Sequence, residues 1–236
     1  RYSTTGTSNI KNAQPMIVEG ENFKLAIAHN GNVVNSLELK RELEELGQEF
    51  NTSSDSEVIA KIVASAPANT WEGRIAYLIG KVQGAYSLTL MTEKELIAVR
   101  DPLGVRPLCF GSVNGGWIIA SESCALDNVG AKFVREVNLG EAIMFDSKGF
   151  KSIYQKDKEK CSFCVFEHIY FARPDSELDG KLVYKSRLLM GKELAREHPV
   201  EADMVIGVPD SATASAVGYS EQSGIPFGEG LVKNRY

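Results

Sequence analysis

Hydrophobic and polar positions alternate in short blocks, and the first clear block is the apolar run 23–28. This run ends at the polar triplet His29-Asn30-Gly31, and an apolar run bounded by turn residues predicts a buried strand that enters a tight loop. Leucines spaced three and four apart follow over 36–46, and Gly47 is a stop signal, so this segment is predicted to be helical. We therefore expect the loop at 29–31 to join a core strand to a helix.

Between 55 and 154 the pattern changes from helical to strand-like. Asp55-Ser56-Glu57 places a cap and acidic residues at the start of a helix over 58–66, and a further helix is predicted over 74–82. Three strand pairs follow, together with a short helix around 124–126; the pairs are 85–91 with 95–100, 108–111 with 116–121, and 141–145 with 150–154. Helices followed by antiparallel hairpins predict stacked layers of the α+β class.

The charged run 155–160 is predicted to be a solvated linker. Beyond it the pattern predicts a strand, a helix, a buried strand and a helix, over 165–171, 183–197, 202–208 and 213–223. A strand–helix–strand order indicates a βαβ unit with a parallel sheet. We therefore predict two domains, 1–157 and 158–236.

Composition excludes few classes of protein. The chain has 236 residues and a net charge of -5, which argues weakly against a nucleic-acid partner. No apolar run approaches the ~18 residues of a membrane span, and no signal peptide opens the chain. Four cysteines, at 109, 124, 161 and 164, show no secreted spacing, so a cytoplasmic protein is expected.

The Asn30-Gly31 pair is the first candidate for chemistry. A carboxamide beside a glycine N–H can stabilise an oxyanion, although an ordinary turn explains the same dipeptide. His29 is a candidate general base, and the alternative is that it orders the loop by hydrogen bonds.

Three further segments carry a family resemblance. They are Arg1-Tyr2-Ser3-Thr4-Thr5-Gly6, Asn12-Ala13-Gln14-Pro15 and Ser53-Ser54-Asp55-Ser56-Glu57, and with 29–31 they resemble the glutaminase domain of the class II (N-terminal nucleophile) amidotransferases. The segments 100–108 and 171–176 resemble the amidophosphoribosyltransferases of the Bacillus type. The resemblance implies a partial four-layer αββα Ntn-hydrolase domain, followed by the start of a type I phosphoribosyltransferase α/β domain. It also implies a piece of a longer chain, cut at both ends.

The resemblance implies a role for each matching residue of the first domain. Arg1 would bind the α-carboxylate of glutamine, and Asp55 its α-ammonium, unless Asp55 is only a helix cap. Asn30 and Gly31 would supply the oxyanion hole. The family's nucleophile is an N-terminal cysteine, which no residue here matches, so this chain alone is expected not to hydrolyse glutamine.

The second domain carries weaker signals. By resemblance, Ser211 would contact Mg²⁺, or it is a helix N-cap, and Lys233 and Arg235 would lie in the loop over phosphoribosyl pyrophosphate. The resemblance implies that Cys164 binds a [4Fe-4S] cluster. A zinc site made by Cys161 and Cys164 is the alternative.

The function implied is glutamine hydrolysis coupled to ammonia transfer onto phosphoribosyl pyrophosphate, which is the first step of purine synthesis. Purine nucleotides are the expected inhibitors, and a homotetramer is the expected assembly. Two alternatives remain at this point. One is the glutaminase half of glucosamine-6-phosphate synthase, and the other is a non-catalytic module that binds an amino acid or a nucleotide.

Overall fold

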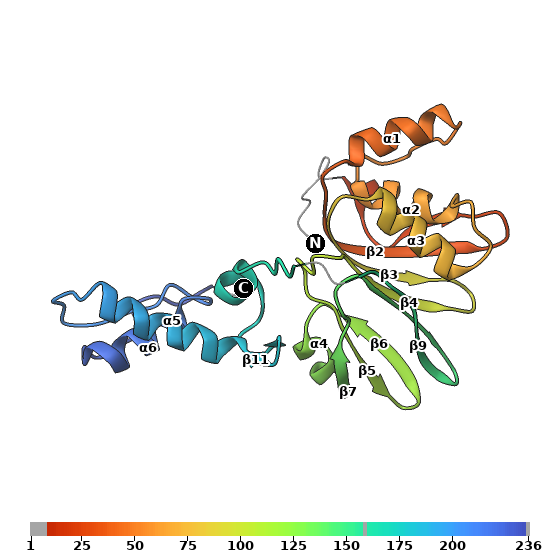
Figure 1. Cartoon of the computed structure of the whole chain (residues 1–236). Helices are drawn as coiled ribbons and strands as arrows, with labels where there is room; N and C mark the ends of the chain where they lie inside the picture. The colour runs from red at the N-terminus through yellow and green to blue at the C-terminus, as the bar shows by residue number, and fades with distance from the viewer. Residues whose placement is uncertain (1–8, 158–159, 235–236) are drawn as a thin grey trace. The chain divides into compact units, whose positions relative to one another are not determined.

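The computed structural model describes residues 9–157 and 160–234 and combines α and β structure (Figure 1). Two compact units make up the chain. The first comprises residues 1–121 and 130–163, and the second comprises 122–129 and 164–236. The second unit therefore includes a short segment, 122–129, that lies between two segments of the first unit along the sequence. The predicted boundary at 157 stays a prediction.

The centre of the first unit is a six-stranded sheet in the order β1-β2-β3-β4-β8-β9, with every neighbouring pair antiparallel. Its strands are β1 (Met16–Glu19), β2 (Lys24–Val33), β3 (Gly84–Met91), β4 (Leu96–Arg100), β8 (Glu141–Asp146) and β9 (Gly149–Gln155). A 3-10 turn, η1 (Ile10–Asn12), precedes β1. Two of the predicted strand pairs are present in this sheet, as β3 with β4 and β8 with β9, whereas no strand is predicted from the sequence at β1.

Helices cover one face of this sheet, and α2 and α3 lie over it in Figure 1. They are α1 (Ser36–Glu45), α2 (Asp55–Ala64) and α3 (Trp71–Lys81). Side chains alternate across each strand, so Ile97 and Val99 join the core under the helices while Ala98 joins a second core on the other face. The helices form because apolar residues on one side of each are buried in the first core.

A three-stranded sheet in the order β6-β5-β7 supplies the second core. Its strands are β5 (Cys109–Val113), β6 (Gly116–Ala120) and β7 (Lys132–Glu136). Phe110 of β5 is fully buried and packs edge-to-face on Phe145 of β8, with ring centroids 5.0 Å apart. The described part of the first unit therefore has a helix layer, a six-stranded sheet and a smaller sheet. This arrangement agrees with a partial αββα domain.

The second unit is mainly helical. It contains α4 (Ser123–Asn128), a wide turn η2 (Glu167–Phe171), the short strands β10 (Glu177–Leu178) and β11 (Lys181–Leu182), α5 (Val183–Glu197) and α6 (Thr213–Ser223). The two long helices cross closely at glycines. A Cβ at Gly191 would lie 1.9 Å from the Ser215 carbonyl oxygen, and one at Gly218 would lie 2.0 Å from that of Leu188. Glycine is required at this crossing because backbone meets backbone.

Two predicted strands of this unit are wrong. Residues 165–171 include the helical turn η2, which the buried Arg187 guanidinium stabilises by donating to the carbonyls of His168 and Ala172, each at 2.7 Å. Residues 202–208 make only one bridge, between Val205 and Phe227, so the described residues give this apolar run no sheet to join. The predicted parallel sheet is therefore not formed within the described part of the second unit.

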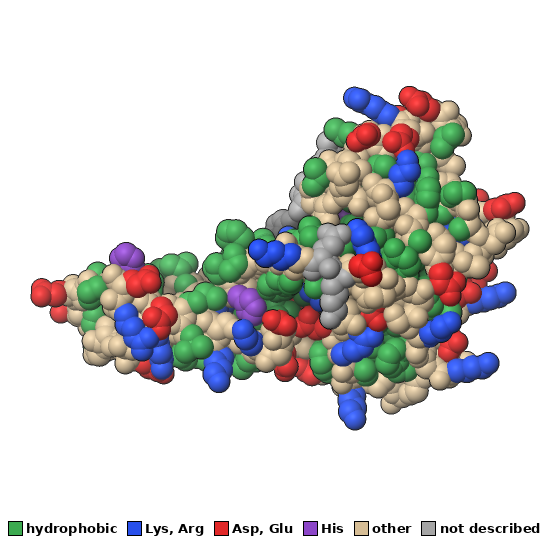
Figure 2. All heavy atoms as spheres, viewed as in Figure 1, with side chains coloured by type: hydrophobic (Ala, Val, Ile, Leu, Met, Phe, Trp, Pro, Cys, Tyr) green, Lys and Arg blue, Asp and Glu red, His purple; other side chains and the backbone are tan. Residues whose placement is uncertain are grey.

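Acidic and basic side chains are interspersed on the side of the molecule seen in Figure 2. Among the described residues, this side therefore shows no continuous basic patch of the kind that binds nucleic acid. In the described portions of the chain, every helix is too short or too polar to cross a membrane.

Candidate functional site

Asn30 and Gly31 lie inside a strand. Strand β2 continues to Val33, and Asn30 pairs with Ser87 of β3 while Gly31 pairs with Tyr86. The predicted loop at 29–31 is therefore wrong, because pairing with β3 carries the strand through the Asn-Gly dipeptide. The helix predicted next is confirmed as α1.

One edge of β2 faces side chains from other segments of the first unit. Pairing with β1 stops at Ile27, and we call the stretch from Ala28 to Val33 on that side the open edge. The His29 N–H donates to the Gln14 side-chain oxygen at 2.7 Å, and the Val33 N–H donates to Asp55 Oδ2 at 3.0 Å. Backbone N–H groups alternate between the two edges of an antiparallel strand, so the Gly31 N–H points to this same edge.

His29 is buried against the start of α2. Its Nδ1 lies 3.1 Å from Ser56 Oγ and 3.8 Å from Asp55 Oδ1, and its side chain is 0% exposed. The Gln14 amide nitrogen also donates to Ser56 Oγ, at 3.1 Å. Four side chains, Gln14, His29, Asp55 and Ser56, thus form a continuous polar network along the open edge. This network agrees with His29 as an ordering residue and makes it a poor general base, because the imidazole is closed off from solvent.

The Asn30 side chain points to the opposite face of β2 from His29, because side chains alternate along a strand. Its Nδ2 donates to Ser121 Oγ at 3.4 Å, at the end of β6. The Asp55 carboxylate contacts the strand at Val33, three residues from Asn30, which is ~10 Å along an extended chain. The two predicted residues therefore share one short stretch of β2 but approach it from different sides.

Gly31 has no room for a side chain. A Cβ there would lie 1.9 Å from the Ala85 carbonyl oxygen and 2.8 Å from His29 Nε2. Its φ is 154°, which L residues rarely adopt. The glycine is therefore fixed by the packing of β2 on β3. Arg1, the predicted carboxylate partner, lies outside the described residues.

A hollow of about 720 Å³ lies in the second unit. Ser211 and Lys233 both line it, together with Arg173 and Arg187. The Lys233 ammonium is 3.4 Å from Asp210 Oδ2 in the same hollow. Two residues predicted separately from the sequence are thus brought together beside hydroxyl, carboxylate and guanidinium groups, which suit a phosphorylated ligand and its cation. Arg235 lies outside the described residues.

Arg187 is a residue that sequence reasoning missed. It is 2% exposed, and burial lowers the pKa of its guanidinium. The sequence signal was only an arginine on a helix, which is normally solvated. Gln14 lies in the segment Asn12-Ala13-Gln14-Pro15, but nothing in the sequence indicates its contact with His29.

Cys164 is half-buried, and its carbonyl accepts the Glu167 N–H at 3.0 Å. Cys161, three residues earlier, is exposed. The described residues contain no group of three or more His, Cys, Asp or Glu side chains that could share a metal ion. A cluster with four thiolate ligands is therefore not completed by these residues alone.

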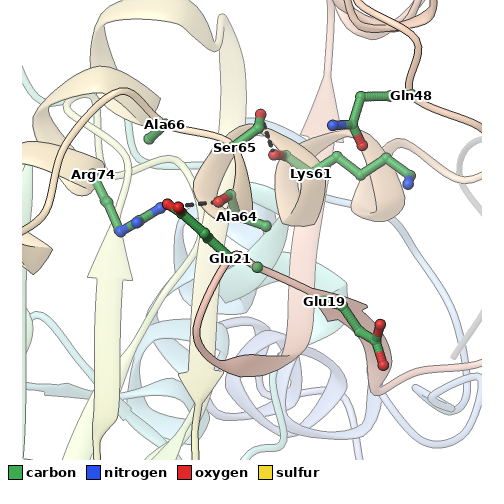
Figure 3. Close-up of a pocket in the computed structure, with 9 residues that line it drawn as sticks. Glu19, Glu21, Gln48, Lys61, Ala64, Ser65, Ala66 and Arg74 are labelled. Carbon is green, nitrogen blue, oxygen red and sulfur yellow. Dashed lines mark hydrogen bonds between the residues drawn. The ribbon is translucent and has the colours of Figure 1, made fainter.

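A smaller hollow of about 220 Å³ lies at the far end of the sheet, where β2 begins. Figure 3 shows Arg74 reaching the last turn of α2, where its guanidinium donates to the carbonyls of Val63 and Ala64 at 2.9 and 3.0 Å. These bonds cap the helix, so we assign this arginine a structural role.

Comparison with known proteins places these features in context. Residues 2–128 match the model of a family described as "Glutamine amidotransferase domain". The amidophosphoribosyltransferase of Archaeoglobus fulgidus is 46% identical over 100% of this chain and 52% of its own length. That of Bacillus subtilis is 45% identical over 100% of this chain and 50% of its own.

Two solved structures are also similar to this chain over nearly all of its length. One described as the allosteric regulatory enzyme of purine biosynthesis has a TM-score of 0.94 at 45% identity, covering 100% of this chain and 51% of that one. The glutamine phosphoribosylpyrophosphate amidotransferase of Bacillus subtilis, complexed with ADP and GMP, has a TM-score of 0.92 at 44% identity, covering 98% and 51%. The chain thus spans about half the length of the curated relatives that it matches.

Proposed function

The chain belongs to the glutamine amidotransferase domain family, and from that premise we propose that it is part of an amidophosphoribosyltransferase. In that reaction glutamine is hydrolysed to glutamate, and the ammonia displaces pyrophosphate from C1 of phosphoribosyl pyrophosphate. The product is 5-phosphoribosylamine, the first intermediate of purine synthesis.

The proposal rests on how much of the chain is similar to the amidophosphoribosyltransferases. The family model ends at residue 128, but the relatives match 100% of the chain, including all of the second unit beyond it. A glucosamine-6-phosphate synthase shares the glutaminase half, but the relatives matched over 129–236 are amidophosphoribosyltransferases. The second unit is accordingly proposed to begin a type I phosphoribosyltransferase domain.

We assign the glutamine site to the open edge of β2. The Gly31 N–H and the Asn30 carboxamide are proposed to stabilise the oxyanion formed when the glutamine amide is attacked. Asp55 is proposed to hold the α-ammonium. Its Oδ2 is engaged by Val33 and its Oδ1 faces His29, so a glutamine ammonium would approach Oδ1. Arg1 is proposed to pair with the α-carboxylate.

The attacking thiol is proposed to be the N-terminal cysteine of the family. Cys109 and Cys124 are 3% and 5% exposed, and burial raises the pKa of the Cys124 thiol, which disfavours the reactive thiolate. These two are therefore unsuited to attack a substrate, which supports the proposal that this chain alone does not hydrolyse glutamine.

The hollow at Ser211 is proposed to bind phosphoribosyl pyrophosphate. Lys233, together with Arg235, would neutralise phosphate charge, and the Ser211 hydroxyl with the nearby Asp210 carboxylate offers the oxygen ligands that Mg²⁺ prefers. Bound Mg²⁺ would supply charge to the leaving pyrophosphate.

Three further properties are proposed by resemblance to the family. Cys164 is proposed as one ligand of a [4Fe-4S] cluster, purine nucleotides as inhibitors and a homotetramer as the assembly. The nucleotide proposal is supported by the ADP and GMP complex of the Bacillus subtilis relative. A cytoplasmic location is proposed as well.

The test uses the protein encoded by the full reading frame. We expect glutamine-dependent release of pyrophosphate from phosphoribosyl pyrophosphate, with one glutamate formed for each pyrophosphate. Fructose 6-phosphate supplied as the acceptor should give no product. If glutamate forms only with fructose 6-phosphate, the protein is a glucosamine-6-phosphate synthase, and if no glutamate forms at all, the non-catalytic module is supported.

A further inference from the structure

The chain passes from the first unit to the second between Ser121 and Glu122, and again between Phe163 and Cys164. Both residues use their side chains to hold another segment. Ser121 Oγ accepts the Asn30 Nδ2 hydrogen at 3.4 Å, within the first unit. Glu122 Oε2 accepts the Arg173 N–H and the Ser176 hydroxyl, each at 2.7 Å, within the second unit.

A carboxamide nitrogen has two hydrogens, and Ser121 engages one of them. The amide plane of asparagine is otherwise loosely held, because rotation about its last torsion is broad. With one N–H donated to Ser121, the direction of the second N–H is fixed in the amide plane. An oxyanion donor has its full effect only when it is held in place before the reaction. The Ser121 hydroxyl therefore fixes the direction in which the Asn30 carboxamide can donate its second N–H.

The position of Ser121 depends in turn on its neighbour. Glu122 accepts two short hydrogen bonds from the segment 173–176, and the Ser123 hydroxyl accepts the Glu177 N–H at 2.8 Å. Ser176 is 0% exposed, so its end of this attachment is sheltered from water. The same segment supplies Arg173 and Pro174 to the hollow that holds Ser211 and Lys233. Contacts within the second unit thus hold Glu122, the residue that follows Ser121 along the chain.

We propose that Ser121 is a positioning residue for the Asn30 carboxamide and that Glu122 anchors it to the 173–176 segment of the second unit. The inference rests on the proposed glutaminase function. It adds a role for two residues that neither the sequence motifs nor the comparisons with relatives assign.

The kinetic test uses the protein encoded by the full reading frame. Ser121→Ala should lower kcat for glutamine hydrolysis about tenfold, equal to ~1.4 kcal/mol of barrier, with KM for glutamine little changed. Ser121→Thr keeps the hydroxyl and should restore most of kcat. Glu122→Ala should lower kcat and Glu122→Gln, which keeps an acceptor oxygen, should not. Ser65→Ala is the control, because that exposed hydroxyl donates to the Lys61 carbonyl of the helix it follows, at 2.8 Å.

An independent measurement follows the Asn30 side-chain amide by NMR after labelling asparagine nitrogen. The signal is identified by its loss in Asn30→Ala, and it should shift in Ser121→Ala and in Glu122→Ala. If glutamine is hydrolysed but neither variant changes kcat, or if the amide signal stays in place, the inference is overturned. If no glutamate forms at all, the proposed function fails, and the amide signal still decides the placement of Asn30.

Discussion

The Asp55 carboxylate accepts the Val33 backbone N–H at 3.0 Å, which ties the first turn of α2 to the open edge of β2. Asp55 is 3% exposed, so this carboxylate is part of the fold as well as a candidate substrate ligand. A negative charge in the first turn of a helix is also favoured by the helix dipole. One residue therefore serves the helix, the strand and the proposed glutamine ammonium.

The first prediction separates the structural role of Asp55 from its proposed role in binding the glutamine ammonium. Asp55→Asn keeps an oxygen that accepts the Val33 N–H but removes the charge, so KM for glutamine should rise at least tenfold while the free energy of unfolding falls by only ~1 kcal/mol. Asp55→Ala should cost ~2–3 kcal/mol, because the Val33 N–H is left buried without this acceptor. Urea titrations and steady-state kinetics measure both effects. Unchanged KM in Asp55→Asn would remove the ammonium role.

Gly31 should not tolerate a methyl group. Gly31→Ala places a Cβ 1.9 Å from the Ala85 carbonyl oxygen, so β2 and β3 must separate, and we expect a loss of ~2–4 kcal/mol in the free energy of unfolding. The control is Gly80→Ala in α3, where a Cβ meets nothing within 4 Å. That variant should be stabilised by ~0.5–1 kcal/mol, because alanine favours helix. Equal stabilities of the two variants in urea would contradict the packing described.

Acid should weaken the first unit at Glu141. Burial alone would raise the pKa of this carboxyl, but hydrogen bonds from the Arg135 guanidinium and the Asn138 N–H outweigh it and hold the pKa below the ordinary 4.5. Since the folded pKa is the lower one, the ionised group stabilises the fold above its ordinary pKa. This stabilisation is lost as the pH falls through the folded value.

We therefore expect Glu141→Gln to flatten the acid dependence of stability, measured by urea unfolding between about pH 6 and about pH 3. Glu44→Gln is the control, because Glu44 is half-exposed and, among the described residues, pairs with Lys40 of its own helix at 3.9 Å. A Glu141→Gln curve parallel to that of the unsubstituted protein would show that this carboxyl does not titrate as described.

Arg187 should contribute far more to the stability of the second unit than an exposed arginine on the same helix does. Arg187→Met keeps the length of the side chain but leaves the carbonyls of His168 and Ala172 without their donor, so a loss of ~2–4 kcal/mol is expected. Arg196→Met, on the exposed side of the same helix, should cost under ~0.5 kcal/mol. Hydrogen exchange of the amides over 167–172 is the measurement. Equal protection in both variants would contradict the role given to Arg187.

The sequence predicted most elements of the first unit because their patterns are local. The leucines of α1 and the alternation in β3, β4, β8 and β9 each decide their own structure. The error at Asn30-Gly31 has a different origin. Asn-Gly favours a turn in isolation, and only the pairing of these residues with Ser87 and Tyr86, more than 50 residues later, continues the strand.

Long-range contacts also explain why some contacts of the candidate site could not be predicted from the sequence. Gln14 meets His29 through a fold that brings the 12–15 segment to the open edge, and no spacing in the sequence encodes that contact. Ser121 meets Asn30 across 91 residues. In the second unit, the apolar run at 202–208 has the pattern of a buried strand, but a pattern does not provide the neighbouring strand that burial requires.

The most direct test of the account is kcat for glutamine hydrolysis by Asn30→Ala, made in the protein encoded by the full reading frame. Loss of one oxyanion donor should lower kcat by ~100-fold or more, with KM for glutamine within about twofold of the original. Asn22→Ala is the matched control, because Asn22 is exposed and lies before the start of the same strand, outside the open edge, and it should keep full activity. A kcat in Asn30→Ala equal to that of Asn22→Ala would contradict the assignment of the glutamine site to this stretch of β2.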